Sequence, residues 1–220
     1  MDAEVSPREV DSAEGVDDWR VIGDGLCSFF AAPDLARAAS FAAAAAALPG
    51  AGAHRPDLDL RAEGVYVRLI THTDELYALT TADLAMARQL SALAAEHGLP
   101  PEPARVQTVQ LTIDALDLDA VKPFWRTVLG YADRAESPED LIDPRWRGAT
   151  IWFQQMDCPR PQRNRIHVDV WVPKEDAAAR VAAAVEAGGR IVFEGNAPSG
   201  ITLADAEGNE VCVASIEGRG

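Results

Sequence analysis

The sequence has little of what secreted, membrane-bound or nucleic-acid-binding proteins need. Lysine occurs only at Lys122 and Lys174, and 35 acidic residues outnumber 20 basic residues, which gives a formal net charge of −15. This charge disfavours nucleic acid or an anionic membrane surface as a partner. The three cysteines, Cys27, Cys158 and Cys212, are odd in number and far apart. They indicate no disulfide framework and fit a reducing cytosol.

The sequence also has no long hydrophobic run. The alanine run from Ala42 to Ala47 is too short and too weakly apolar to cross a bilayer, and it is typical of the middle of a soluble helix. The acidic N-terminus has no apolar segment of the kind found in signal peptides. Richness in alanine and arginine, with scarcely any lysine, indicates a GC-rich bacterial genome. We therefore expect a bacterial cytoplasmic protein.

A chain of 220 residues is long enough for two small domains, each with its own core. The clearest boundary is the proline-rich segment that begins Leu99-Pro100-Pro101. The first residues are polar and acidic and show no periodicity, which is typical of disorder. We predict an acidic flexible tail at 1–16, a first domain at 17–98, a proline-rich linker at 99–105 and a second domain at 106–215.

The sequence of the first domain predicts two strands, a helix, a further strand and a second helix. Two strands, 19–22 and 26–30, flank a Gly-Asp-Gly sequence that favours a hairpin. A helix is predicted from Pro33 to Leu48, where Pro-Gly ends it, and a second from about Thr81 to Glu96. Between the helices, residues 65–72 alternate as a strand does. We therefore expect an α+β fold, in which an antiparallel sheet carries helices on one face.

Two histidine segments flank this alternating strand. Residues 54–57 read His-Arg-Pro-Asp, and Thr71-His72 follows the strand. By alternation, His72 is expected on the side of Tyr66 and Arg68, where a histidine of the earlier loop could face it. Two imidazoles around one pocket can donate and accept protons near neutral pH. This chemistry suits loss of water from a polar heterocycle.

The layout resembles the pterin-4a-carbinolamine dehydratases, whose motif is a His-His-Pro turn, a strand, a Thr-His pair and an Asp that opens a helix. Arg55 stands where the family has its second histidine, and it keeps a hydrogen-bond donor but cannot act as a base. The resemblance implies a 4a-hydroxytetrahydropterin dehydratase, a lyase that needs no metal or redox cofactor. Asp83 has a second explanation, because Thr80-Thr81-Ala82-Asp83 is also a good helix start. The candidate catalytic residues are His54, Arg55 and His72, and the candidate substrate-binding residues are Pro56, Asp57 and Asp83.

The second half contains a weak repeat with a period near 57 residues. Residues 109–113 align with 166–170, and the segment 151–154 aligns with the segment 210–213, with Phe153 over Val211 and Gln154 over Cys212. Two copies of a strand, a helix and further strands resemble the vicinal oxygen chelate family, which includes glyoxalase. That resemblance implies paired βαβββ modules and a concave ligand pocket.

In this family, metal ligands come from four strand positions. Carried over position by position, these are Gln110, Gln154, His167 and Cys212, and the carboxylates found in metal-using relatives are missing. We therefore expect no metal, because a divalent ion in such a site needs anionic oxygen. A flat, hydrogen-bonding ligand could still stack there. The candidate binding residues are Gln110, Trp152, Gln154, His167 and Trp171.

Three interpretations remain open at this point. The first is a carbinolamine dehydratase with an accessory glyoxalase-like domain. The second is a catalytically degenerate or repurposed protein that binds an aromatic small molecule in the C-terminal cleft. The third is a metal-dependent lyase or isomerase in the second domain. In each case the expected partner is a small molecule such as a pterin or another aromatic heterocycle, and both resemblances imply a homo-oligomer.

Overall fold

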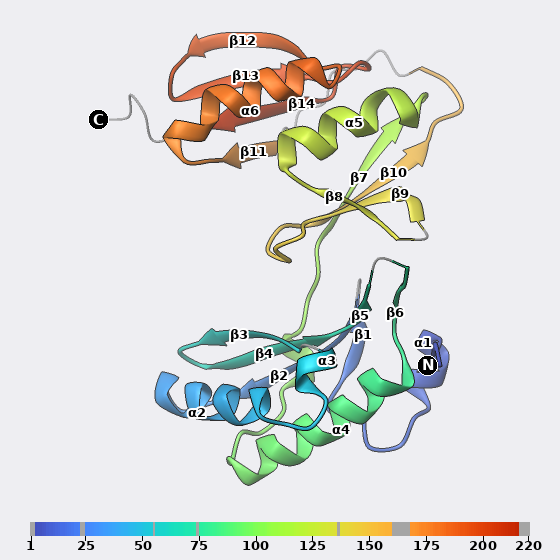
Figure 1. Ribbon diagram of the computed structural model, residues 1–220, viewed down its shortest axis with the longest axis vertical. Helices are drawn as coiled ribbons and strands as arrows, with labels where there is room; N and C mark the ends of the chain where they lie inside the picture. Colours follow the sequence, from blue (N-terminus) through green and yellow to red (C-terminus); the bar gives the residue numbers. More distant parts are fainter. Residues whose placement is uncertain are drawn as a thin grey trace. The chain divides into compact units, whose positions relative to one another are not determined.

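The computed structural model describes residues 3–22, 25–54, 56–73, 75–135, 137–159 and 168–215. The chain divides into two compact units, Met1–Val109 and Gln110–Gly220, each with its own hydrophobic core (Figure 1). Both units combine sheets with packed helices, so the predicted α+β class is confirmed. Within the described ranges, no helix is long and apolar enough to cross a membrane.

The first unit is built on a four-stranded antiparallel sheet in the order β1-β2-β4-β3. Successive strand residues point to opposite faces. In β4, Val65, Val67 and Leu69 are fully buried under the helices, and Tyr66 and Arg68 lie on the other face. The strands are β1 (Arg20–Ile22), β2 (Gly25–Ala31), β3 (Asp57–Arg61) and β4 (Gly64–Leu69), and a separate ladder pairs β5 (Thr71–His72) with β6 (Tyr77–Ala78).

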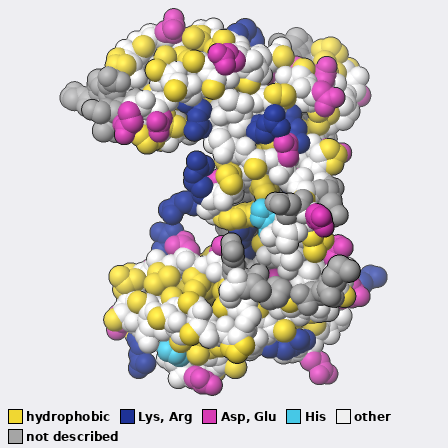
Figure 2. All heavy atoms as spheres, in the orientation of Figure 1, with side chains coloured by type: hydrophobic (Ala, Val, Ile, Leu, Met, Phe, Trp, Pro, Cys, Tyr) yellow, Lys and Arg dark blue, Asp and Glu magenta, His cyan; other side chains and the backbone are white. Residues whose placement is uncertain are grey.

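Two helices cover one face of this sheet. They are α2 (Leu35–Ala46) and α4 (Thr81–Glu96), and the short helix α3 (Ala51–His54) connects α2 to β3. The Asp34 carboxylate begins α2 by accepting a bond from the Arg37 backbone N–H at 2.8 Å. Hydrophobic side chains gather over α2 in Figure 2, because its exposed face is mostly alanine. Both predicted helices are present close to their expected bounds.

The N-terminal residues are folded onto the first unit, and the prediction of a flexible tail at 1–16 is wrong for the described part. Helix α1 (Pro7–Asp11) begins at Ser6 with a capping box, in which Ser6 and Glu9 exchange side-chain bonds with each other's backbone N–H groups. Val10 and Val16 are buried in the core. Glu4 forms a β-bridge with Thr80. Local capping and two buried valines therefore order a segment whose composition resembles disorder.

Residues 99–105, which the sequence predicts to be a proline-rich linker, are also bound to the first unit. β1 pairs with only the first three residues of β2, Gly25–Cys27. Farther along β2, the Ala31 N–H donates to the Pro100 carbonyl at 2.9 Å, and the Phe29 carbonyl accepts from the Glu102 N–H at 2.8 Å. Residues 100–102 thus continue the sheet where β1 stops, and the short 3-10 helix η1 (Pro103–Arg105) follows them.

The second unit consists of two βαβββ modules, as the repeat predicts. The sheet orders are β7-β10-β9-β8 and β11-β14-β13-β12, and in each module the first strand pairs in parallel with the last. The first module contains β7 (Gln110–Ala115), α5 (Leu118–Leu129), β8 (Ala132–Arg134), β9 (Ser137–Ile142) and β10 (Thr150–Gln155). The second contains β11 (Val168–Trp171), α6 (Lys174–Glu186), β12 (Arg190–Asn196), β13 (Gly200–Ala204) and β14 (Glu210–Ala214).

The two modules share one core beneath α5 and α6. Alternation along the strands predicts that Val109, Leu111, Ile151, Phe153, Val211 and Val213 face the helices. The last four lie in this core, but at the start of β7 Leu111 is 37% exposed and the preceding Val109 is 55% exposed. The Glu207 carboxylate also ties the modules together. It accepts bonds from the backbone N–H groups of Leu116 and Asp117, at 2.7 and 2.8 Å, at the start of α5.

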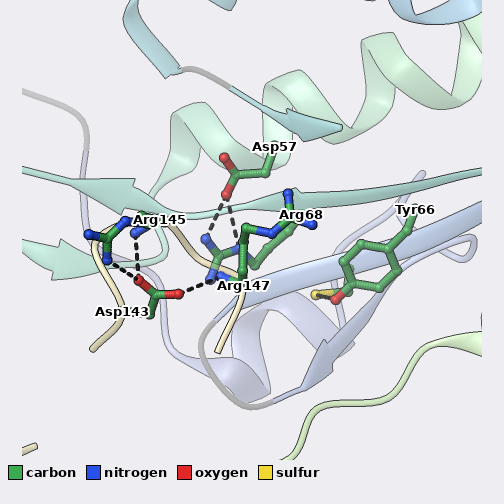
Figure 3. Close-up of polar contacts among 7 residues, drawn as sticks. Asp57, Tyr66, Arg68, Asp143, Arg145 and Arg147 are labelled. Atoms are coloured by element: carbon green, nitrogen blue, oxygen red, sulfur yellow. Dashed lines mark hydrogen bonds and ion pairs between the residues drawn. The ribbon is translucent and has the colours of Figure 1, made fainter. Parts of the chain in front are cut away.

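A buried aspartate begins the turn before the last strand of each module. In the first module the Asp143 carboxylate accepts bonds from three backbone N–H groups at 2.8–3.0 Å, those of Arg145 and Arg147 (Figure 3) and that of Gly148. In the second, the Asp205 carboxylate accepts from the N–H groups two and four residues ahead. The two turns are therefore built in the same way, although few of their residues match.

The Asp143 turn makes the second unit sensitive to acid. Burial opposes the charge of Asp143, but the backbone N–H donors of the turn outweigh it and lower the pKa of this carboxyl from its ordinary 3.8. A lowered folded pKa contributes stability above the unfolded pKa, and this contribution is lost as pH falls through the folded value. We expect urea unfolding of the second unit to need less denaturant as pH falls from 5 to about 2. In Asp143→Asn this pH dependence is expected to be weaker; an unchanged dependence would assign it to other carboxyls.

Candidate functional sites

Of the three candidate catalytic residues in the first unit, His72 is the one whose side chain the structure describes. It lies on β5. The four-stranded sheet ends at Leu69, and β5 pairs instead with β6, where His72 lies opposite Tyr77. The two rings contact edge to face, with centroids 5.4 Å apart. The His72 side chain is exposed. The expected strand over 65–72 is thus broken, and alternation with Tyr66 and Arg68 does not fix the direction of His72.

A buried hydrogen-bond network holds β5 against the start of α4. One carboxylate oxygen of Asp83 accepts bonds from the Thr71 hydroxyl at 2.8 Å, the Thr80 N–H at 2.8 Å and the Thr80 hydroxyl at 3.0 Å. Asp83 is fully buried. In the structure this side chain caps α4 and positions the strand that carries His72, and its part in substrate binding stays a prediction.

Removal of the Asp83 carboxylate is expected to destabilise the first unit. Asp83→Ala leaves the N–H and hydroxyl of Thr80 and the hydroxyl of Thr71 without their acceptor, at a cost of about 2–4 kcal/mol. Urea unfolding measures this cost. The matched control is Glu96→Ala, an exposed carboxylate on the same helix, which is expected to change the free energy of unfolding by less than about 0.5 kcal/mol. Equal effects of the two substitutions would contradict the capping role.

The other candidate residues of the first domain lie in and before β3. His54 ends α3, and its side chain lies outside the described residues, as does the whole of Arg55. Pro56 is half-buried just before β3. Asp57 is exposed and pairs with the Arg68 guanidinium at 2.6 Å across the β3–β4 ladder (Figure 3). In this structure Asp57 is thus engaged in an ion pair.

The face of the first sheet that carries no helix is covered by other side chains of the first unit. On this face Cys27 is fully buried and Phe29 nearly so. The Tyr66 hydroxyl donates to the Cys27 sulfur at 2.9 Å (Figure 3), and burial, followed by the Cys27 charge, raises the pKa of Tyr66. The Arg105 guanidinium stacks 3.9 Å above the Phe29 ring. This face therefore offers no open binding surface around Cys27.

In the second unit, the predicted binding residues lie on strands and on faces away from the shared core. Gln110, Trp152 and Gln154 are exposed, with Trp152 at 38%, and Trp171 on β11 is 53% exposed. His167 lies outside the described residues.

The ladder corrects one equivalence between the modules. Thr112 lies opposite Trp152 in the first module, and its repeat equivalent Asp169 lies opposite Cys212 in the second. The counterpart of Cys212 is therefore Trp152 and not Gln154. Three extra residues between the two aligned strands explain the shift, because the offset of 57 at the first strands becomes 60 at the last strands.

Sequence reasoning missed one buried polar pair on this face. Asp140 on β9 lies opposite Trp152 and is only 6% exposed. One of its oxygens accepts bonds from the Ser137 hydroxyl at 2.7 Å and from Arg134 at 3.1 Å, and its Oδ1 has no hydrogen-bond partner within the described part of the chain. The sequence Ser-Pro-Glu-Asp-Leu-Ile gives no strand pattern in its first half, so nothing in it places Asp140 beside Trp152.

Comparison with known proteins assigns a family to each unit. Residues 3–93 match the family model described as pterin 4 alpha carbinolamine dehydratase, and residues 110–214 match that of the glyoxalase-like domain. The chain joins a carbinolamine dehydratase-like domain to a glyoxalase-like domain. Both predicted resemblances are thereby confirmed. No curated protein matches the sequence.

Solved structures similar to the chain cover about half of it. A glyoxalase-related enzyme from Fulvimarina pelagi has 19% identity and a TM-score of 0.41, covering 50% of this chain and 88% of that chain. The fosfomycin resistance protein FosX from Mesorhizobium loti has 12% identity and a TM-score of 0.40, covering 49% and 90%. A glyoxalase/dioxygenase from Nostoc punctiforme has 16% identity and a TM-score of 0.40, covering 52% and 94%.

The glyoxalase-like domain lacks a donor set suited to a divalent ion among its described residues. The equivalent strand positions hold Gln110, Trp152 and Cys212, with no carboxylate among them. Within the described part of the chain, no group of three or more His, Cys, Asp or Glu side chains is placed to hold a metal ion. A hard divalent cation needs anionic oxygen, so these described positions do not fit one.

Proposed function

We propose that the first unit is a 4a-hydroxytetrahydropterin dehydratase, a lyase that converts the carbinolamine into the quinonoid dihydropterin and water. The observation that carries this proposal is the exposed His72, held by the buried Thr71–Asp83 network inside the segment that matches the dehydratase model. His54 and Asp83 fall in the same matched segment. The order of these residues in the chain is the order of the family motif.

In the proposed reaction, the N5–H proton leaves the ring, the C4a–O bond breaks, and the hydroxyl departs as water while a C4a–N5 double bond forms. No electrons enter or leave, so acid and base groups are sufficient. His72 and His54 would shuttle the proton between N5 and the departing hydroxyl, since an imidazole can both accept and donate near neutral pH. Arg55 would donate a hydrogen bond to the substrate or to its leaving hydroxyl.

The direct test is a dehydration assay on the full chain. A 4a-hydroxytetrahydropterin is generated freshly and its decay is followed by ultraviolet absorbance with and without protein. We expect decay faster than the spontaneous rate, in proportion to protein concentration. A rate equal to the spontaneous one at micromolar protein would refute the dehydratase function.

A further inference from the structure

A row of four side chains crosses the first sheet of the glyoxalase-like domain. Thr112 on β7 lies opposite Trp152 on β10, Trp152 lies opposite Asp140 on β9, and Arg134 on β8 contacts Asp140. Ile151 and Leu141, the neighbours of the two middle residues, pair in the core beneath α5. The row therefore lies on the opposite, helix-free face of the sheet.

Asp140 is the unusual member of this row. It is nine-tenths buried on a face that no described helix covers, and among the described residues its Oδ1 has no hydrogen-bond partner. Arg134 and Ser137 both bind the other oxygen. Buried acceptors are normally satisfied, and one left without a partner is unfavourable. Such an atom beside a partly exposed indole is the pattern expected of a site whose occupant supplies the missing donor.

The row has the chemistry of a site for a flat heterocycle. The Asp140 carboxylate accepts hydrogen bonds, the Arg134 guanidinium donates them, and the two lie side by side at 3.1 Å. An edge that carries an amino group, which donates, and nearby an oxo group or an unprotonated ring nitrogen, which accepts, matches this pair of acceptor and donor. The Trp152 indole, 38% exposed, provides an aromatic surface for stacking.

We propose that Arg134, Asp140, Trp152 and Thr112 bind an amino-oxo heterocycle of the pterin type. The amino group donates to Asp140 Oδ1, and the ring stacks on Trp152 once the indole turns aside from its ladder neighbour. The choice of a pterin among such heterocycles rests on the proposed function of the first unit. The glyoxalase-like domain then holds a second pterin site, distinct from the one that contains His72.

Two probes of the same size test this proposal. Pterin is 2-amino-4-oxopteridine, and lumazine has an oxo group in place of the amino group. Both are titrated by calorimetry into the full chain carrying His72→Ala, which weakens the first site. We expect saturable pterin binding, with lumazine at least about tenfold weaker because its oxo group faces a carboxylate. Absence of pterin binding, or equal affinity for the two probes, overturns the proposal.

Substitutions within the proposed site, compared with one outside it, test where pterin binds. In the same background, Asp140→Asn is expected to weaken pterin binding at least about tenfold and to remove the preference over lumazine. Trp152→Ala is expected to weaken both probes, which keeps the test valid if Asp140→Asn fails to fold. The matched control is Phe193→Leu, an exposed aromatic side chain on β12 of the other sheet, which is expected to leave binding unchanged. Loss with Phe193→Leu and none with Asp140→Asn would refute this site.

The dehydration assay separates this proposal from the proposed function. Asp140→Asn is expected to keep the wild-type dehydration rate, since Asp140 belongs to the second unit. If the wild type fails to accelerate dehydration but pterin binding still depends on Asp140, only the dehydratase function is lost. If dehydration proceeds and the His72→Ala chain binds no pterin, only the second site is refuted.

Discussion

His72→Ala is expected to lose most of the acceleration of carbinolamine dehydration, by about 100-fold or more. A positioned general acid or base contributes roughly 10²–10⁴-fold to the rate of a proton-transfer step. His72 is the described histidine in the family motif, and its side chain is exposed on a strand held by a buried network. The measurement is the ultraviolet decay of the carbinolamine at equal concentrations of folded wild type and variant.

The matched control is His97→Ala. His97 lies at the C-terminal end of α4, where its ring contacts Phe41 edge to face at 6.1 Å, whereas β5 lies against the other end of the helix. It is expected to keep the wild-type rate. His54→Ala tests the second histidine of the proposed pair in the same assay. Wild-type rates from both His54→Ala and His72→Ala would remove the basis for the dehydratase assignment.

Asp205→Ala is expected to destabilise the second unit by about 3–5 kcal/mol, which is a large part of the stability of a small domain. Asp205 is fully buried. Its carboxylate accepts four bonds of 2.8–3.0 Å, from the Trp125 indole N–H, the Glu207 N–H, and the backbone and side-chain N–H groups of Asn209. Loss of this carboxylate therefore removes the acceptor of four hydrogen bonds, including the buried one from Trp125.

The matched control is Trp125→Phe, which removes one of these donors and keeps an aromatic ring in the core. It is expected to cost less than Asp205→Ala, because the turn keeps its carboxylate and its other three bonds. Urea unfolding is followed with probes for each unit. Asp205→Ala is expected to shift the transition of the second unit alone. A loss below about 1 kcal/mol would show that the turn does not depend on this carboxylate.

Most helices and strands of the first unit could be predicted, because the sequence patterns that indicate them lie within or next to each element. Helix α4 runs from Thr81 to Glu96, as its capping sequence and apolar stripe indicate. The N-terminal segment was missed, since a helix of five residues has no periodicity, although Ser6 and Glu9 carry a capping-box signature. The break after Leu69 was also missed, because alternation continues in the sequence beyond the point where the pairing partner changes.

In the second unit the repeat predicted the architecture but not the register. Pairing between strands depends on the lengths of the connections, and a shift of two residues keeps the same faces buried. Alternation therefore placed Trp152 and Gln154 correctly on the outer face but could not decide which of them matches Cys212. The position of Asp140 beside Trp152 could not be predicted, because it depends on the pairing of β9 with β10 and no local sequence pattern identifies that pairing.

The pairing of residues 100–102 with β2 has a practical consequence for cloning. A truncated gene that stops at Gly98, where the prolines suggest a natural cut, deletes the strand that satisfies the Phe29 carbonyl and the Ala31 N–H. It also deletes Arg105, which shields the Phe29 ring. The truncated protein would have an unpaired strand edge next to an exposed aromatic ring. Such an edge promotes aggregation, and we expect the protein to form inclusion bodies. A soluble stand-alone dehydratase-like domain should be cut after residue 109.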